Sequence, residues 1–445
     1  MKSLIRSIVR NNNFLSMFGN VLFAGMAFIA FAILARSYTP ADFGRYMIFV
    51  VGGTFIEMFR FGLTRTSMVK SLASSDSQRH PSLEGAGYAI GLVVTLAINL
   101  LIWLAFILIP DVESSNFYYF LKWYPWLSLA NLPMNNAINL VMARERFDRL
   151  LVIRFISSTI FLAYVVANFL VLKRSIEYTV VVQIVSQLAA SVVCMVLGWD
   201  SVKSIRHASW QAAHELLSFG KYSMGTLIST SLLKSADTFI LGLIPILGVD
   251  AVAIYSIPLK LTEILEIPLR SFAATVYPRM AKASSLDNPQ QVSGLLTDYT
   301  GMLLLLFIPM LLFCEVFAQP LVLLFGGAQY LAAIPIFRMY ILYGLFLPID
   351  RLTGVALDAI GKPKVNLYKV LVMATINIAG DVVAIVVLKS LIAVAAVTVF
   401  NTFVGAYIGY AVLRRHLSIN VNHLFIRGWN LISAKRRELY GHLSR

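Results

Sequence analysis

Residues 39–72 read TPADFGRYMIFVVGGTFIEMFRFGLTRTSMVKSL, and residues 248–284 read GVDAVAIYSIPLKLTEILEIPLRSFAATVYPRMAKAS. In each segment a short polar turn leads into a long apolar run, which carries a few charged side chains and ends in a basic loop. Aligned on one tyrosine, the segments also pair an acidic and a basic position: Tyr46 with Tyr255, Glu57 with Glu266, and Lys70 with Arg279. This correspondence predicts an internal duplication in which two halves of the chain fold alike.

The whole chain has the composition of a membrane protein. Of its 445 residues 58% are hydrophobic and only 13% are charged, whereas soluble globular proteins are about 25% charged. The apolar runs are about 20 residues long and do not alternate, which is typical of membrane-spanning helices rather than barrel strands. The sequence therefore predicts an all-α polytopic membrane protein with about twelve transmembrane helices. The predicted spans are residues 14–35, 43–62, 86–109, 119–141, 150–171, 178–198, 222–245, 251–276, 299–318, 334–356, 367–388 and 391–412.

Basic residues predict the orientation of these spans, because Lys and Arg in short loops stay on the cytoplasmic side of a membrane. They concentrate in alternate loops and in the C-terminal tail, so both termini are expected in the cytoplasm. Much of the net charge of +15 comes from these basic loops and the tail. The charge therefore needs no nucleic-acid partner to explain it, and we predict none. The basic tail is expected to lie on lipid headgroups.

Two sets of six spans divide the chain. We expect an N-terminal six-helix lobe over residues 1–205, a C-terminal six-helix lobe over residues 206–412 and a basic cytoplasmic tail over residues 413–445. An even number of spans per repeat gives both halves the same orientation. That is the parallel-repeat (6+6) layout of transporters, which bind their substrate between the repeats.

Charged side chains within the spans are the main functional signal. A charge at bilayer depth costs at least ~2.5–3.5 kcal/mol, so such residues face the protein interior or a water-filled cavity. Spacings of three or four residues put them in pairs on common helix faces, and the pattern predicts one shared polar compartment. The charges are Glu57 and Arg60 on the second span, Lys234 and Asp237 on the seventh, and Lys260, Glu263, Glu266 and Arg270 on the eighth.

Two further charged residues rank lower. Arg338 lies on the tenth predicted span, and Asp381 shares a face of the eleventh with Asn377. We expect Asp381 to form a structural pair between helices, with a role in ion coupling as the alternative.

Motifs for nucleotide binding and metal catalysis are missing from the sequence. It contains no Walker loop, HExxH motif, paired Cys ligands or dinucleotide fingerprint. We therefore expect no enzyme activity, no metal centre and no cofactor. Transport would be driven by a proton or sodium gradient, by the membrane potential or by consumption of the product outside.

Several stretches resemble bacterial polysaccharide flippases. LARSYTPADFGRY, followed after a span by FGLTRTSMVKSLA, resembles the opening of that family. PLVLLFGGAQYLAAIPIFRMYIL from Pro320 resembles its loop and tenth span, and DAIGKPKVNLYKV from Asp358 resembles its next loop. The resemblance covers nearly the whole chain and indicates the oligosaccharidyl-lipid and polysaccharide transporters, which are related to lipid II flippases and to multidrug and toxin extrusion transporters. One departure is Ala253, where many members keep Gly.

The resemblance implies a V-shaped bundle in which helices 1, 2, 7 and 8 line a central cavity. It implies an undecaprenyl-diphosphate-linked glycan as cargo, moved from the cytoplasmic to the periplasmic leaflet of a bacterial inner membrane for O-antigen, capsule or exopolysaccharide biosynthesis. A glycan polymerase and a chain-length regulator would be its protein partners, beside membrane lipid. Cations contact phosphate well, Arg through forked hydrogen bonds. The expected cargo contacts are Arg60, Lys234, Lys260 and Arg270, with Glu57, Asp237, Glu263 and Glu266 orienting them or carrying coupling protons.

Two other functions fit parts of the pattern. An ion-coupled multidrug or cation antiporter of the same fold would favour carboxylates in its cavity, whereas Lys and Arg are at least as frequent here. A membrane glycan polymerase or ligase would need a large outside loop rich in Arg, His or acidic residues. The longest outside segment, residues 318–334, is mostly apolar and has no charged side chain.

Overall fold

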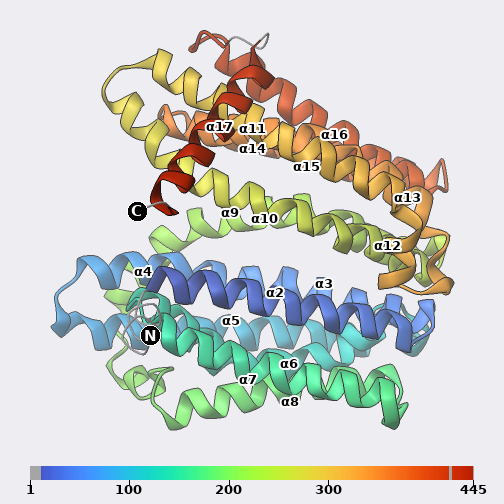
Figure 1. Ribbon diagram of the computed structural model, residues 1–445. Coiled ribbons are helices and arrows are strands. Elements are labelled where there is room, and N and C mark those ends of the chain that lie inside the picture. Colours follow the sequence, from blue (N-terminus) through green and yellow to red (C-terminus); the bar gives the residue numbers. More distant parts are fainter. Residues whose placement is uncertain (1–11, 420–422, 444–445) are drawn as a thin grey trace. The chain divides into compact units, whose positions relative to one another are not determined.

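The computed structural model describes residues 12–419 and 423–443, with the side chains of residues 12–18, 73–74, 222–223, 225–234 and 434–443 left aside. Over these ranges every regular element is a helix, and the chain divides into two compact units, Met1–Ser231 and Leu232–Arg445. Each unit is a bundle of long helices (Figure 1).

In the first unit, α6 is the central helix: it packs on α8, α5 and α3, while α2 packs on α7. Buried apolar side chains from several helices form its core. The helices of this unit are α2 (Asn12–Ser37), α3 (Pro40–Gly62), α4 (Arg65–Ser74), α5 (His80–Leu108), α6 (Tyr118–Ala143), α7 (Phe147–Ala167), α8 (Ile176–Val196) and the first part of α9 (Trp210–Leu243), with the short η1 (Ser77–Arg79), η2 (Val112–Ser114), η3 (Asn168–Leu172, a π-helical turn) and η4 (Val202–His207).

In the second unit, α16 packs between α14 and α15, and α10 packs on α11, α13 and α14. The C-terminal α17 packs on α11. Beyond the end of α9 its helices are α10 (Val249–Ser285), α11 (Pro289–Val316), α12 (Ala318–Phe325), α13 (Ala333–Ile341), α14 (Tyr343–Ala359), α15 (Pro363–Val386), α16 (Leu391–Leu413) and α17 (Leu424–Leu443), with the short η5 (Pro245–Leu247) and η6 (Ala328–Tyr330).

The predicted spans coincide with the long helices, which confirms the all-α polytopic fold. Among the described residues, eight helices are long and apolar enough to cross a membrane. The number rises to nine if the pair α13–α14, bent by 41°, forms one span. The three remaining predicted spans are α6, α9 and α10. Polar and charged side chains within these helices lower their hydropathy, and several of them belong to the sites described below.

The boundary between the units falls inside α9. Ala212 and Leu216, near the start of α9, pack in one core cluster with Met68 and Leu83 of the first unit. Asp237, farther along the same helix, bonds to helices of the second unit. We predicted that the two repeats meet between residues 205 and 206. This boundary stays a prediction, because α9 is continuous and contributes to both compact units.

The start of α3 shows how local sequence fixes the helix that carries Glu57 and Arg60. Thr39 is its N-cap, with extended backbone and a side-chain Oγ1 that accepts a hydrogen bond of 3.2 Å from the Asp42 backbone N. Pro40 occupies the first turn, where its missing N–H costs nothing. These contacts fix the residue at which α3 begins, and therefore which of its side chains share a face of the helix.

Candidate functional site

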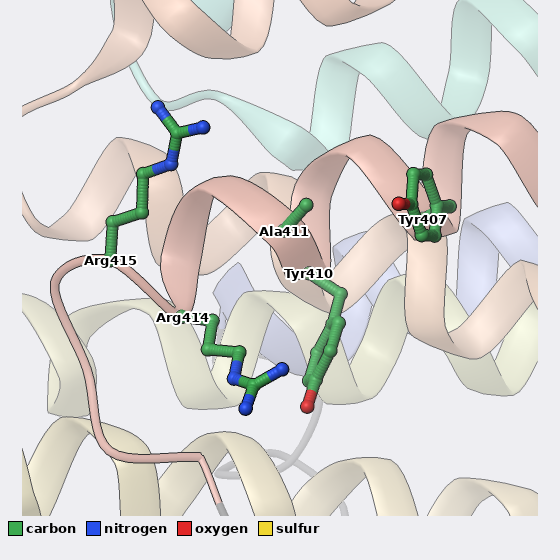
Figure 2. Close-up of a pocket in the computed structure, with 5 residues that line it drawn as sticks. All are labelled: Tyr407, Tyr410, Ala411, Arg414 and Arg415. Atoms are coloured by element: carbon green, nitrogen blue, oxygen red, sulfur yellow. The ribbon is translucent and has the colours of Figure 1, made fainter.

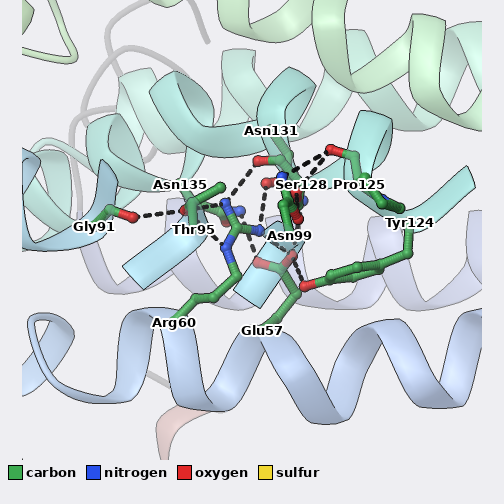
Figure 3. A network of polar contacts seen from close by, with 10 residues as sticks. All are labelled: Glu57, Arg60, Gly91, Thr95, Asn99, Tyr124, Pro125, Ser128, Asn131 and Asn135. Carbon is green, nitrogen blue, oxygen red and sulfur yellow. Dashed lines mark hydrogen bonds and ion pairs between the residues drawn. The ribbon is translucent and has the colours of Figure 1, made fainter. Parts of the chain in front are cut away.

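Arg60 on α3 lies at the centre of a polar network inside the first unit (Figure 3). Its side chain is fully buried. Nε donates to Thr95 Oγ1 at 3.0 Å, Nη2 donates to the same oxygen at 2.9 Å and to the Ser128 carbonyl at 2.6 Å, and Nη1 donates to Asn131 Oδ1 at 3.1 Å. The partners come from α5 and α6, so the guanidinium joins three helices. In this arrangement each of its nitrogens is engaged within the protein.

Glu57, one turn before Arg60, is the acidic partner of this network. It forms an ion pair with Arg60 Nη1. Its Oε1 also accepts hydrogen bonds from Tyr124 Oη at 2.9 Å and Asn131 Nδ2 at 3.2 Å, and its Oε2 accepts one from Asn135 Nδ2 at 3.3 Å. The Glu57 side chain is 23% exposed, whereas that of Arg60 is 0% exposed. Glu57 is therefore the member of the pair that can meet a ligand.

In the second unit, Asp237 on α9 is buried among hydrogen-bond donors from three other helices. Its Oδ2 accepts from Tyr255 Oη of α10 at 2.5 Å and from Thr398 Oγ1 of α16 at 2.9 Å. Its Oδ1 accepts from Asn377 Nδ2 of α15 at 2.6 Å. All these donors are neutral, so they stabilise the carboxylate without compensating its charge.

Asp381 joins the same cluster. The Asn377 amide that contacts Asp237 also donates to Asp381 Oδ2 at 2.9 Å, and Asn401 Nδ2 donates to Asn377 Oδ1 at 3.2 Å. Asp381 and Asn377 are buried, and Asp381 Oδ1 has no hydrogen-bond partner within the described residues. Neither Asp237 nor Asp381 forms an ion pair with any side chain that the structure describes.

The chemistry of this carboxyl pair follows from its surroundings. Two ionised carboxylates that share one amide group repel each other, and burial at membrane depth removes the water that would screen them. Among the described side chains the pair has no compensating charge, and a proton or a small cation would supply one. Carboxylate, amide and hydroxyl oxygens are the ligand types that hard cations prefer. The cluster of Asp237, Tyr255, Asn377, Asp381 and Thr398 is called the acidic site below.

The other charges predicted on the eighth span form two separate pairs along α10. Lys260 Nζ lies 2.7 Å from Glu263 Oε2, and the two side chains are 23% and 52% exposed. Arg270 pairs with Glu266 and is 63% exposed. Exposed charges near the middle of a spanning helix avoid lipid. The face of α10 with Lys260 and Glu263, near the middle of the predicted span 251–276, is therefore expected to border a water-containing space. The Lys234 side chain lies outside the described residues.

The remaining predicted residue, Arg338 on α13, pairs with Glu315 of α11. Arg338 Nε lies 3.3 Å from Glu315 Oε1, and both side chains are about half exposed. The sequence predicted that the charges of the second, seventh and eighth spans share one compartment. The structure brings Asp237 together with Asp381 instead of with the α10 ion pairs, and a compartment common to all three helices stays a prediction.

Sequence reasoning missed several residues of these networks. Thr398 and Asn401 lie within the highly apolar last span. The available signal was the helical spacing of the few polar residues in this span. Lys369 on α15 is buried, and its Nζ lies 2.7 Å from Asp350 Oδ1 of α14. Its signal was plain, since it is a Lys within a predicted span. Thr95, Ser128 and Asn131 carry no charge and could be found only from the fold.

Comparison with known proteins places this architecture in a family. The family described as "Polysaccharide biosynthesis protein" matches residues 9–284, and the family described as "MatE" matches residues 223–383. A protein of Haloferax volcanii named "Probable low-salt glycan biosynthesis flippase Agl15" is 23% identical over 254 residues, which are 56% of this chain and 52% of that protein. The chain thus spans about half the length of this curated relative.

Solved structures share the fold over almost the whole chain. An inward-facing multidrug resistance MATE family transporter of the MOP superfamily has a TM-score of 0.72 at 14% identity, over 89% of this chain and 94% of its own. The lipid II flippase MurJ in an inward closed conformation has a TM-score of 0.68 at 13% identity, over 96% and 99%. With the first family matching more than half of its residues, the chain belongs to the polysaccharide biosynthesis protein family and has the fold of MOP superfamily transporters.

Proposed function

We propose that the protein is a flippase that moves a lipid-linked oligosaccharide across a membrane by alternating access. The cargo class is a polyprenyl diphosphate glycan, with undecaprenyl as the carrier in a bacterial inner membrane. Membership of the family and the names of its relatives, which are flippases and transporters rather than enzymes, support this function. Surface polysaccharide synthesis, with a polymerase and a chain-length regulator as partners, is the expected pathway.

One observation carries the proposal: α10 exposes two ion pairs near the middle of a helix that is 37 residues long. The predicted span within this helix covers residues 251–276, so Lys260 and Glu263 lie near its middle and Arg270 lies six residues before its end. A wet face with cations at this depth offers replacement solvation to a diphosphate, which carries about two negative charges and cannot enter hydrocarbon alone. The prenyl chain needs no such path, because it is soluble in the lipid.

The test is complementation of a flippase-deficient strain, with surface glycan as the readout. Lys260→Ala and Arg270→Ala are expected to reduce glycan export strongly at equal membrane abundance, and Lys260→Glu more than Lys260→Ala, because it reverses the charge. Lys282→Ala is the matched control, since Lys282 is an exposed Lys on the same helix beyond the predicted span. Full export by both alanine variants would show that the α10 cations do not serve the cargo.

We propose further that the acidic site couples transport to a proton or to sodium. Its two carboxyl groups share Asn377 and have only neutral partners among the described side chains, so binding of one cation stabilises the folded protein by mass action. Sodium chloride is expected to raise the unfolding temperature more than choline chloride does if sodium is the ion. If the proton is the ion, lowering the pH has that effect instead.

Asp381→Asn is expected to abolish this response, and Glu315→Gln, which removes a half-exposed carboxylate of the same unit, is expected to keep it. A wild-type protein that responds to neither ion would rule out coupling at the acidic site and leave the flippase proposal standing.

A second function, ion-coupled export of organic cations, is favoured by the same site and by the match of residues 223–383 to the MatE family. Drug susceptibility of an efflux-deficient strain separates the two. Protection from cationic drugs without restored glycan would select the antiporter, and restored glycan without protection would select the flippase.

A further inference from the structure

The C-terminal helix α17 is fastened to α11 by close backbone packing. A Cβ added at Gly301 of α11 would lie 1.9 Å from the Leu424 carbonyl oxygen, and one added at Gly428 of α17 would lie 2.3 Å from the Gly301 carbonyl carbon. Only glycine fits at this crossing. Arg427 Nε also lies 2.7 Å from Asp298 Oδ1. One face of α17 is therefore fixed against α11 along residues 424–428.

This crossing lies at the end of a membrane span. α11 begins at Pro289, and Asp298 and Gly301 lie at the start of the span predicted from residue 299. Figure 1 shows α17 running across α11 rather than along it. The preceding segment is held at the same end of the unit, because Ser293 Oγ donates to the Ser418 carbonyl oxygen at 2.7 Å. A helix in this position lies along the membrane surface.

The opposite face of α17 exposes large apolar side chains. Phe425, Ile426 and Trp429 are 50%, 60% and 62% exposed. At 100° per residue they fall within one arc of the helix, on the side away from Leu424, Arg427 and Gly428. A soluble surface gains nothing from such an arc, whereas Trp and Phe are favoured at the boundary between headgroups and acyl chains.

A second feature of the same end is a hollow of about 410 Å³ at the last turns of α16 (Figure 2). It is lined by Tyr407, Tyr410, Ala411, Arg414 and Arg415. The Arg414 side chain and the Tyr410 ring point the same way, and Arg415 points to another side. The guanidinium groups of Arg414 and Arg415, just beyond the end of α16, can each bind a lipid phosphate. The Tyr410 phenol, on the side of Arg414, can add a hydroxyl hydrogen bond.

From these features we infer that α17 and the end of α16 form a docking surface for an anionic phospholipid leaflet. Phe425, Ile426 and Trp429 insert among the acyl chains, while Arg414 and Arg415 bind lipid phosphates. Charge complementarity selects this occupant, because a basic hollow follows directly from a spanning helix with an exposed apolar surface. The sequence also continues α17 with Lys435, Arg436 and Arg437. This surface serves attachment and orientation, and it is independent of the cargo.

The insertion is tested in the full-length protein with Cys194 and Cys314, its two cysteines, replaced by Ala. Ile426→Cys carries an environment-sensitive fluorophore, in nanodiscs of phosphatidylglycerol and phosphatidylcholine. Asp287→Cys, in the exposed turn between α10 and α11, is the matched water-facing reference. Doxyl-labelled lipid is expected to quench the probe at position 426 and aqueous iodide to quench the probe at position 287.

Two outcomes would overturn the insertion. Quenching of the position 426 probe by iodide, as strong as at position 287, would show that the face is hydrated. Protection from both quenchers would show that protein, such as a second copy of the chain, covers it.

The headgroup site is tested by the preference of spin-labelled phosphatidylglycerol over phosphatidylcholine for the protein. Arg414→Gln and Arg415→Gln are each expected to lower this preference by about fivefold. Lys389→Gln, an exposed cation in the turn at the other end of α16, is the control and is expected to leave it unchanged. An unaltered preference in both arginine variants would remove the hollow from the docking surface.

Discussion

At the level of single residues, Arg60 and Asp237 are buried in opposite ways. Arg60 has a carboxylate partner and an oxygen acceptor for each nitrogen, so its charge is neutralised inside the first unit. Asp237 has hydrogen-bond donors but no cation among the described residues. The Arg60 network therefore holds three helices together by itself, whereas the acidic site has no compensating charge among the described side chains.

The Arg60 network predicts a large stability effect. Arg60→Met leaves Glu57 as a poorly compensated carboxylate and should lower the free energy of unfolding by about 3–5 kcal/mol. The double variant Glu57→Gln, Arg60→Met removes both charges and should recover much of that loss. Denaturant unfolding in detergent micelles measures both. If Arg60→Met unfolds like the wild type, the ion pair is not a structural element of the first unit.

Asp200 predicts a pH effect in the loop between α8 and η4. Its carboxyl group is buried, and Oδ2 has no partner among the described residues. Burial raises the pKa of Asp200 above its ordinary value, and backbone N–H groups oppose this only in part. The folded state thus holds the proton more tightly than the unfolded state. Protonated Asp200 contributes its full stabilisation of the folded state below the pKa of about 3.9 that the group has in the unfolded state. This contribution is lost as the pH rises through the higher pKa of Asp200 in the folded state.

Asp200→Asn should therefore match the wild type in unfolding temperature near pH 4 and exceed it increasingly towards neutral pH. Thermal unfolding of both proteins across this range measures the difference. A constant difference at all pH values would assign the effect of the substitution to packing rather than to the carboxyl group.

At the level of elements, hydropathy located the spans but not their breaks or extensions. Residues 334–356 were predicted as one span, and the structure divides them into α13 and α14 with a bend of 41°. α10 continues to Ser285, beyond its predicted span, because Lys282 and its neighbours at the helix end are compatible with helix outside the membrane. Hydropathy predicts which residues lie within the membrane, whereas the positions of helix ends depend on capping residues and on contacts with other helices.

The contact of α11 with α17 gives a prediction at this scale. Gly301→Ala places a methyl group against the Leu424 carbonyl, and overpacking of about 1–3 kcal/mol should raise the detached population of α17 at least about fivefold. Faster tryptic cleavage within α17 in detergent reports it. Gly25→Ala on α2 is the control, because its Cβ would meet no atom within 4 Å. Equal cleavage rates would mean that α17 is not held at Gly301.

At the level of the whole molecule, the sequence predicted the class and the helices because hydropathy and loop charge are local properties, and the resemblance of several stretches indicated the family. It also marked Asp237 and Asp381 as unusual. It could not join them, since Asp237 meets Asn377 and Thr398 across 140 and 161 residues of chain. The Arg60 network could be predicted only in part. Its two charged residues were evident in the sequence, but Thr95, Ser128 and Asn131 become its partners only because α5 and α6 pack on α3.

The duplication makes a prediction about topology that needs no knowledge of the sites. If each repeat has an even number of spans, equivalent loops of the two halves lie on the same side of the membrane. Alkaline phosphatase fused in the loops after Leu108 and Leu243 should be active, and fusions after Ala143 and Ala359, which precede the basic loops, should be inactive. A fusion after Leu413 should also be inactive. Green fluorescent protein at the same sites should give the reverse pattern. Opposite signals from the loops after Ala143 and Ala359, which both join the fourth and fifth spans of their halves, would make the repeats antiparallel and would require a different span count.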